Sequence, residues 1–431
     1  MNRVLTGLLW TIVLTLSLPL LSQPTQQDTL KEVMRRLEVL TRVLEESRLG
    51  EVAQRQYQPT QGVGPAAAQV YYKKKSGVSI AGYGEVIYQN YASITDAGNP
   101  SGKKDQIDYL RNIIYLGYKF NDRFLFNAEI EIEHAIVGED GPGEVALEFG
   151  YIDALLSPSL TFRAGMILVP VGIINELHEP PTFYGVLRPE TERNIIPTTW
   201  RSNGFGFLGN TEGGWSFRLY LMEGLNAAKF SSSGIRSARQ SGGKAIAEDF
   251  ALSGRVEYKA LPGVTLGASF FTGNSGQGLK DSSGTEINAR TTLAALHGII
   301  QHKGLEIRAL YALSSVDDVT RLNQTLGLSG SNSIGEQQMG YYATIAYDIL
   351  RVLRPGSEGQ LLPFVQYESY NTQEEVPEGF STSATLKRTN LTIGLLYKPI
   401  PQIGFKVDYI NRDNEAGTAL DQWNVGVTYL F

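Results

Sequence analysis

The chain contains no cysteine and only four histidines among its 431 residues. The missing thiols exclude disulfides, a thiol nucleophile and the lipidated cysteine of a lipoprotein, which suits an exported chain without redox chemistry. The formal net charge is −6, so the sequence carries no basic footprint for nucleic acid. These absences argue against several enzyme, lipoprotein and nucleic-acid-binding classes.

Long apolar runs are missing everywhere except at the start. Arg3 precedes a nearly unbroken apolar run over residues 5–21, which predicts a signal peptide over 1–22 cleaved after Ser22. A membrane-anchoring helix is the alternative, although no stop-transfer charge cluster follows. No later segment approaches the roughly 18 apolar residues that a spanning helix needs. A mature membrane protein would therefore have to cross the bilayer as strands, which a mean hydropathy of −0.15 permits.

Residues 23–49 have a helical pattern. Their apolar side chains alternate at spacings of three and four, which predicts a short periplasmic coiled coil, with an amphipathic helix packed on another surface as the alternative. These apolar residues are Leu30, Val33, Leu37, Leu40 and Leu44. Residues 50–76 begin with a Gln-, Gly- and Ala-rich stretch, which predicts a linker.

From residue 77 onward the period changes to two. Residues 123–134 show this clearly, because Phe124, Phe126 and Ile130 alternate with polar residues such as Asn127 and Glu129. Alternation of this kind occurs in any half-buried antiparallel sheet. Sixteen such segments can be recognised between residues 77 and 431, and their connections distinguish a barrel from a sandwich.

Loop length separates by parity along the predicted strands. Even-numbered connections are brief, such as 120–123, 157–160 and 302–304, whereas most odd-numbered ones are long and polar, such as 92–105 and 169–202. Short turns on one side and long loops on the other are typical of an outer-membrane barrel. The predicted fold class is all-β, a transmembrane antiparallel β-barrel of about 16 strands over residues 77–431, preceded by the short periplasmic coiled-coil helix.

The chain ends on a regular amphipathic strand. Trp423, Val425, Val427, Tyr429 and Phe431 share one apolar face, and Phe431 is the last residue. This ending resembles the terminal strand of bacterial outer-membrane proteins, which their barrel assembly machinery recognises. It indicates the outer membrane as location and the assembly machinery and membrane lipid as partners.

Charged residues on the predicted inner face carry both signs. A charge facing lipid at mid-bilayer costs on the order of 2–4 kcal/mol for Arg, so these side chains are expected to point into the lumen. A lumen with both signs favours small ions and polar solutes, although solvated cross-strand pairs would look the same. The predicted pore-lining residues of the wall are Arg111, Arg163, Arg218, Arg255, Glu129, Glu131 and Glu133.

The longest connection, residues 169–202, is too apolar in patches to be a surface tether. Long loops of this kind are usually functional, so we expect it to fold into the lumen and form the constriction. Its charged side chains would line the narrowest point. They are Glu176, His178, Glu179, Arg188, Glu190, Glu192, Arg193 and Arg201.

The run FRAGMILVPVGIINELHEPPTFYGVLRPETERNIIPTTWRSNGFGFLG, with the upstream EIEIEHA and GYGEV, resembles the phosphate-selective porin O/P family and its broad relatives. The resemblance covers most of the chain from 77 to 431. It implies a 16-stranded barrel, usually a homotrimer, with a periplasmic N-terminal segment and an inward third loop. The named members select phosphate with arginines and a lysine cluster, whereas residues 169–202 contain glutamates and no lysine. We therefore take from this resemblance the expectation of the family's fold, and not that of its phosphate selectivity.

Catalytic and metal chemistry receive little support. Glu176, His178 and Glu179 could suggest a metal site, yet no histidine has H-E-x-x-H spacing and no G-x-S-x-G element occurs. We therefore expect no enzyme, no metal and no cofactor. Two functions remain open: a porin for passive diffusion of ions and small polar solutes, and a structural protein that tethers the outer membrane through its N-terminal coiled coil.

Overall fold

The computed structural model describes residue 36, residues 58–138 and residues 141–431. The chain divides into two units, residues 1–56 and 57–431. In the first unit only Arg36 is described, and it is helical. The predicted signal peptide over 1–22 and the predicted coiled coil over 23–49, Arg36 apart, lie outside the described residues and stay predictions.

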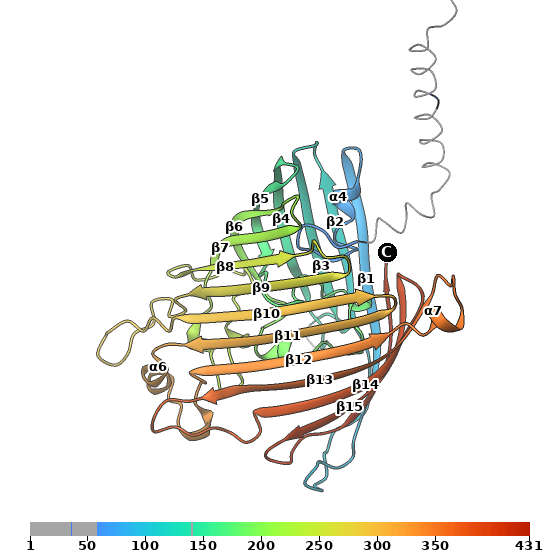
Figure 1. Ribbon diagram of the computed structural model, residues 1–431. Helices are drawn as coiled ribbons and strands as arrows, with labels where there is room; N and C mark the ends of the chain where they lie inside the picture. Colours follow the sequence, from blue (N-terminus) through green and yellow to red (C-terminus); the bar gives the residue numbers. More distant parts are fainter. Residues whose placement is uncertain (1–35, 37–57, 139–140) are drawn as a thin grey trace, which may run out of the picture. The chain divides into compact units, whose positions relative to one another are not determined.

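The second unit is a closed antiparallel barrel in which each strand pairs with its sequence neighbours and the first pairs with the last. The prediction of 16 strands is confirmed (Figure 1). The strands are β1 Gly77–Tyr91, β2 Gln106–Lys119, β3 Phe124–Glu133, β4 Val145–Ser157, β5 Leu160–Leu168, β6 Arg201–Asn210, β7 Trp215–Glu223, β8 Phe250–Tyr258, β9 Val264–Gly273, β10 Thr291–His302, β11 Leu305–Val316, β12 Gln337–Tyr347, β13 Gln360–Glu375, β14 Lys387–Ile400, β15 Ile403–Asn414 and β16 Gln422–Leu430.

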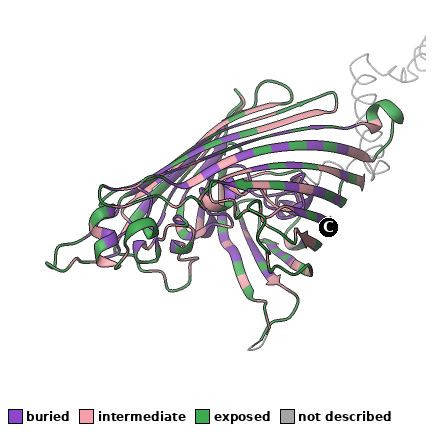
Figure 2. Cartoon of the chain, turned by 90° about the horizontal axis from the view of Figure 1, so that it is seen from below, coloured by how far each residue is buried: buried purple, intermediate pink, exposed green. Residues whose placement is uncertain are grey.

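Period two determines which side chains face outward. Along β16, Trp423, Val425 and Val427 are 42–54% exposed, while the alternate residues Asn424 and Thr428 are buried. The same alternation of exposed and buried residues runs along many strands in Figure 2. Exposed apolar residues on the outside and buried polar ones on the inside are the pattern of a barrel in lipid.

Among the described residues of this unit, the short helices lie in the connections and in the N-terminal segment. Helix α6 (Val319–Thr325) follows β11 among the long loops and α7 (Leu350–Leu353) follows β12 among the short turns, so the two lie at opposite ends of the strands (Figure 1). The other helices are α4 Gln69–Tyr72, α5 Thr191–Asn194, η1 Pro180–Thr182, η2 Ala227–Lys229, η3 Arg236–Ala238 and η4 Gly330–Asn332. Within the described part of the chain, no helix is long and apolar enough to cross a membrane.

The largest apolar core joins long loops to the inner side of the barrel wall. Ile173, Ile195 and Trp200 from the loop after β5 pack in one buried cluster with Phe271 of β9 and Leu310 of β11. Burying apolar side chains stabilises a fold by about 25 cal/mol for each Å² of apolar area removed from water. The barrel therefore holds its long loops by the same force that builds the core of a soluble domain.

The segment expected to be a linker differs from that expectation where it is described. Residues 62–68 are all buried, and α4 contacts β1 and β2. The Gly- and Ala-rich composition that predicted flexibility instead allows close packing, because a Cβ added at Gly64 would lie 2.5 Å from the Glu179 carboxyl carbon. The exposed residues of the described part of this segment are 58–59 at its start and 74–76 before β1.

Candidate functional site

The loop between β5 and β6, residues 169–200, bonds to strands on several sides of the barrel. The Lys406 ammonium on β15 donates to the carbonyls of Pro180 and Gly185 at 2.8 Å each. On β13, Glu368 accepts the backbone N–H of Thr191 at 3.0 Å. The loop was expected over residues 169–202. It ends two residues earlier, because Arg201 and Ser202 belong to β6.

Glu176 ties this loop to β7 and β8. Its carboxylate lies 2.8 Å from Arg218 Nε and 3.2 Å from an Arg255 nitrogen, and Arg255 also pairs with Glu257 at 2.6 Å. All four side chains are at most 10% exposed. Charges so deeply buried are tolerated only because they are paired and hydrogen-bonded.

Glu192 closes the loop on itself and on β12. One carboxylate oxygen accepts the N–H groups of Ile173 and Ile174 at 2.8 and 2.7 Å, and the other accepts the Tyr342 hydroxyl at 2.6 Å. Burial raises the pKa of Glu192, while these bonds favour its charged form. Hydrogen bonds to a charged group contribute about 1.5–3 kcal/mol each, so this residue is a strong structural anchor.

His178 and Glu179 face the opposite wall. His178 Nε2 lies 3.1 Å from Glu129 on β3, and burial lowers the pKa of His178. Glu179 accepts the backbone N–H groups of Ala66 and Ala67 at 3.0 Å, and burial raises the pKa of Glu179 to about 7. Glu176, His178 and Glu179 thus have separate protein partners, and among the described residues no three His, Asp or Glu are grouped as metal ligands.

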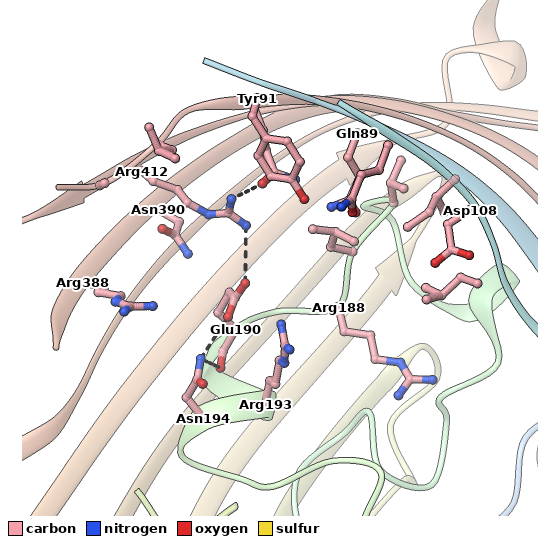
Figure 3. Close-up of a pocket in the computed structure, with 18 of the residues that line it drawn as sticks. Gln89, Tyr91, Asp108, Arg188, Glu190, Arg193, Asn194, Arg388, Asn390 and Arg412 are labelled. Atoms are coloured by element: carbon pink, nitrogen blue, oxygen red, sulfur yellow. Dashed lines mark hydrogen bonds and ion pairs between the residues drawn. The ribbon is translucent and has the colours of Figure 1, made fainter. Parts of the chain in front are cut away.

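A polar cavity of about 830 Å³ opens near the long-loop ends of β1, β2, β15 and β16, and we call it the vestibule (Figure 3). Phe183, Leu187, Arg188 and Glu190 from the loop 169–200 contribute to its lining. Seven basic side chains and five carboxylates line it, which makes it basic although the whole chain is acidic. The seven basic residues are Lys103, Arg111, Arg188, Arg193, Arg236, Arg388 and Arg412.

Four of these arginines, Arg188, Arg193, Arg236 and Arg388, have no carboxylate partner among the described residues, and Arg388 bonds instead to the Thr385 carbonyl and the Tyr370 hydroxyl. Arg188 donates to the His178 carbonyl at 3.1 Å and Arg236 to the Arg193 carbonyl at 3.5 Å. Burial and the nearby charges of Arg239, Arg193 and Arg188 together lower the pKa of Arg236 to about 9. We call Arg188, Arg193 and Arg236 the arginine cluster. A guanidinium keeps its proton in proteins, so the mutual repulsion persists unless an anion approaches.

The predicted site residues fall into two groups. Arg111, Glu133, Arg188, Glu190 and Arg193 line the vestibule. The others lie elsewhere, engaged with the wall or with residues 60–72: Glu129, Glu131, Arg163, Glu176, His178, Glu179, Glu192, Arg201, Arg218 and Arg255. Arg163, for example, is 2% exposed. It pairs with Asp153 at 2.7 Å and stacks on the Tyr151 ring, and these contacts compensate the burial of its charge.

Sequence reasoning did not single out Arg236 or Arg239. Both lie in the loop 224–249, in the run RSAR at 236–239, where two arginines three residues apart were the available signal. Tyr71 and Asn127 were also missed as contact residues. Their partners are 24 to 92 residues away, so no local pattern marks them.

Comparisons with known structures agree with the fold. OmpF of Salmonella typhi in complex with daunomycin matches with a TM-score of 0.54 at 13% identity, over 83% of this chain and 98% of that chain. The anion-selective porin of Comamonas acidovorans matches at 0.52 and 13%, over 83% and 100%, and the outer membrane channel DcaP of Acinetobacter baumannii at 0.51 and 12%, over 83% and 98%. The fold is therefore that of outer-membrane porins and channels.

The sequence comparison identifies a family member. An uncharacterized protein of Aquifex aeolicus (strain VF5) is 38% identical over 385 residues, which cover 87% of this chain and 84% of that protein. The chain belongs to the same family as this Aquifex protein. No protein-family model matches the chain.

Proposed function

We propose that this protein is an outer-membrane porin through which ions and small polar solutes diffuse passively. Solutes would enter the vestibule from the long-loop side, and the loop 169–200 would form the constriction below it. The vestibule carries the proposal, because it is a polar cavity of about 830 Å³ bordered on one side by that loop. The barrel fold of the porins to which the chain is similar supports the same function.

The charges of the vestibule favour anions over cations. Arg111 pairs with Glu85 at 3.0 Å and Arg412 with Glu190 at 3.4 Å, so these charges largely cancel. In the arginine cluster, Arg188 and Arg236 donate only to backbone carbonyls, and no carboxylate pairs with Arg193 in the described structure, so the cluster leaves positive charge facing the cavity. Charge of one sign in a cleft raises the local concentration of ions of the other sign.

Single-channel recording in planar bilayers tests both statements. We expect discrete current steps and, in a salt gradient, a reversal potential of the sign that indicates anion preference. Replacing Arg193 with glutamine should move the reversal potential toward the value for a non-selective pore. A cation-selective reversal potential would contradict the anion preference while leaving the porin proposal standing.

The absence of current steps in the bilayer would contradict the porin proposal itself, provided that heat-modifiable gel migration shows a folded barrel. Wild-type protein and a Gly64→Asp variant should both be recorded, because residue 64 belongs to a segment buried in the barrel.

Location in the outer membrane, a homotrimer and recognition of the Phe431 strand by the assembly machinery are further parts of the proposal. The resemblance to the phosphate-selective porin O/P family stays a prediction.

A further inference from the structure

Residues 60–72 occupy the barrel without belonging to its wall. Ala66 and Ala68 are fully buried, and Val63 and Val70 are 1% exposed. The segment adds no strand to the ring, and its one β-bridge joins Thr60 to Val63 within itself. Helix α4 contacts β1 and β2, beside which it lies in Figure 1.

Polar contacts hold this segment from two sides. From the loop 169–200, Glu179 accepts the N–H groups of Ala66 and Ala67 at 3.0 Å. From the wall, the Asn127 side chain on β3 donates to the Ala67 carbonyl at 2.9 Å. The segment therefore lies between the loop and the barrel wall, and both contribute to its seat.

Tyr71 makes the third set of contacts. Its hydroxyl donates to Asp153 on β4 at 2.6 Å and accepts from Arg163 on β5 at 2.8 Å. Asp153 and Arg163 also pair with each other at 2.7 Å, so the tyrosine completes a network that is already neutral. The network fixes the C-terminal end of the segment without adding an unpaired charge.

The packing surface under the segment is a row of aromatic rings. Tyr83, Tyr115, Phe149 and Tyr151 on β1, β2 and β4 follow one another with ring centroids 6.0, 5.8 and 5.3 Å apart, and all four are at most 2% exposed. They share one buried cluster with Val63 and Ala66–Ala68. Rings on the inner face of a pore would contact water if this segment left.

We infer that residues 60–72 are an internal plug that closes the short-turn half of the lumen, and that full conduction requires this segment to leave its seat. The seat consists of side-chain contacts and small buried residues, with no ladder hydrogen bonds to the barrel strands among those described. Withdrawal of the plug thus leaves all 16 strand pairings intact. The inference rests on the proposed porin function, since it concerns how that pore is regulated.

A charge at residue 64 would release the plug. A Cβ added there would lie 2.5 Å from the Glu179 carboxyl carbon, so Gly64→Asp places a second carboxylate against one held by the amides of Ala66 and Ala67. Gly213→Asp is the matched control, because it adds the same charge at a turn where the nearest atoms are 3.8 Å away. We expect a several-fold higher single-channel conductance or open probability for Gly64→Asp and wild-type values for Gly213→Asp.

A disulfide would lock the plug in place. A Cβ built on Gly117 of β2 lies 2.6 Å from the Val70 Cβ, and a relaxation of about 1 Å would reach disulfide geometry. The natural chain has no cysteine, so the Val70→Cys, Gly117→Cys pair has no other cysteine to pair with in its own chain, and the wild type has no disulfide to reduce. We expect several-fold lower conduction in the oxidised pair than in wild type, and recovery on reduction.

The outcomes separate the plug from the porin. Equal conduction of the oxidised pair, the reduced pair and the wild type, with Gly64→Asp unchanged, would overturn the plug and leave the porin standing. Folded barrels that stay silent in every variant, Gly64→Asp included, would overturn the porin proposal and the plug with it. Gel migration and quantified disulfide formation establish that each variant is folded and cross-linked.

Discussion

The charges of the loop 169–200 are arranged in two opposite ways. Glu176 and Glu192 are at most 4% exposed, and each has at least two positive or N–H partners from the wall or the loop itself. Arg188 and Arg193 lie fewer than 20 residues away in the same loop, face a water-accessible cavity and have no carboxylate partner in the described structure.

This contrast separates charges that hold the structure together from those that we propose act on solutes. Removing one partner of a buried pair leaves an uncompensated charge and costs several kcal/mol, whereas a charge that faces water contributes little to stability. We therefore expect substitutions at Glu176, Glu192 and their partners to change folding. Substitutions in the arginine cluster should change ion selectivity.

The largest effect is expected for Arg255→Met, which removes the more deeply buried of the two arginines that Glu176 and Glu257 share and leaves Arg218 alone between them. Breaking a buried pair in this way should lower the free energy of unfolding by about 3–5 kcal/mol. Urea unfolding in detergent micelles measures it. Arg123→Met is the control, because the Arg123 side chain lies at an exposed turn without a described partner, and it should leave the unfolding midpoint unchanged. Equal stability of the two variants would contradict a structural role for this network of charges.

A somewhat smaller loss is expected for Glu192→Ala. The N–H groups of Ile173 and Ile174 and the Tyr342 hydroxyl would lose their acceptor in a buried site, at about 1–3 kcal/mol for each group left unsatisfied. Partial relaxation should limit the loss. Amide hydrogen exchange should become faster at Ile173 and Ile174, and the exposed Glu248→Ala serves as control. Unchanged protection of both amides would show that another group holds the loop.

Little change in stability but a change in selectivity is expected for Arg236→Gln. Removing one of several mutually repelling charges should leave the free energy of unfolding within about 0.5 kcal/mol of wild type or raise it. The reversal potential in a salt gradient should shift away from anion preference, because the vestibule loses a positive charge. Lys229→Gln makes the same charge change on an exposed residue of the same loop, outside the vestibule lining. An equal shift in both variants would mean that only net charge matters.

The smallest effect is expected for Lys259→Ala. Its ammonium lies 3.0 Å from Glu257, but the lysine side chain is 49% exposed. Exposed pairs of this kind contribute about 0–1 kcal/mol, and Glu257 keeps Arg255 and Arg218 as partners. The urea midpoint should stay near that of wild type. A loss comparable to that of Arg255→Met would break the distinction between the buried pairs and the exposed ones.

The fold could be predicted further than the site. The predicted start of period two at residue 77 and the predicted connection 92–105 agree with the limits of β1 (77–91), because lipid enforces period two on the wall. The reading of residues 50–76 as a linker did not anticipate the burial of Ala66 and Ala68. Small residues are common both in flexible linkers and in tightly packed segments, so composition cannot separate the two.

The sequence by itself determined the number of strands, the lipid-facing side of each and the segregation of short turns from long loops. These properties depend on local alternation and on the cost of placing charge in lipid. Tertiary structure alone decided which charges are paired, because barrel closure brings together groups such as Glu179 and Ala66, 113 residues apart. It also decided that Arg188 and Arg236, from two different loops, share one cavity without a carboxylate partner in the described structure. The contact that satisfies a charge is a property of three-dimensional packing, whereas the face on which the charge lies follows from its position in the strand.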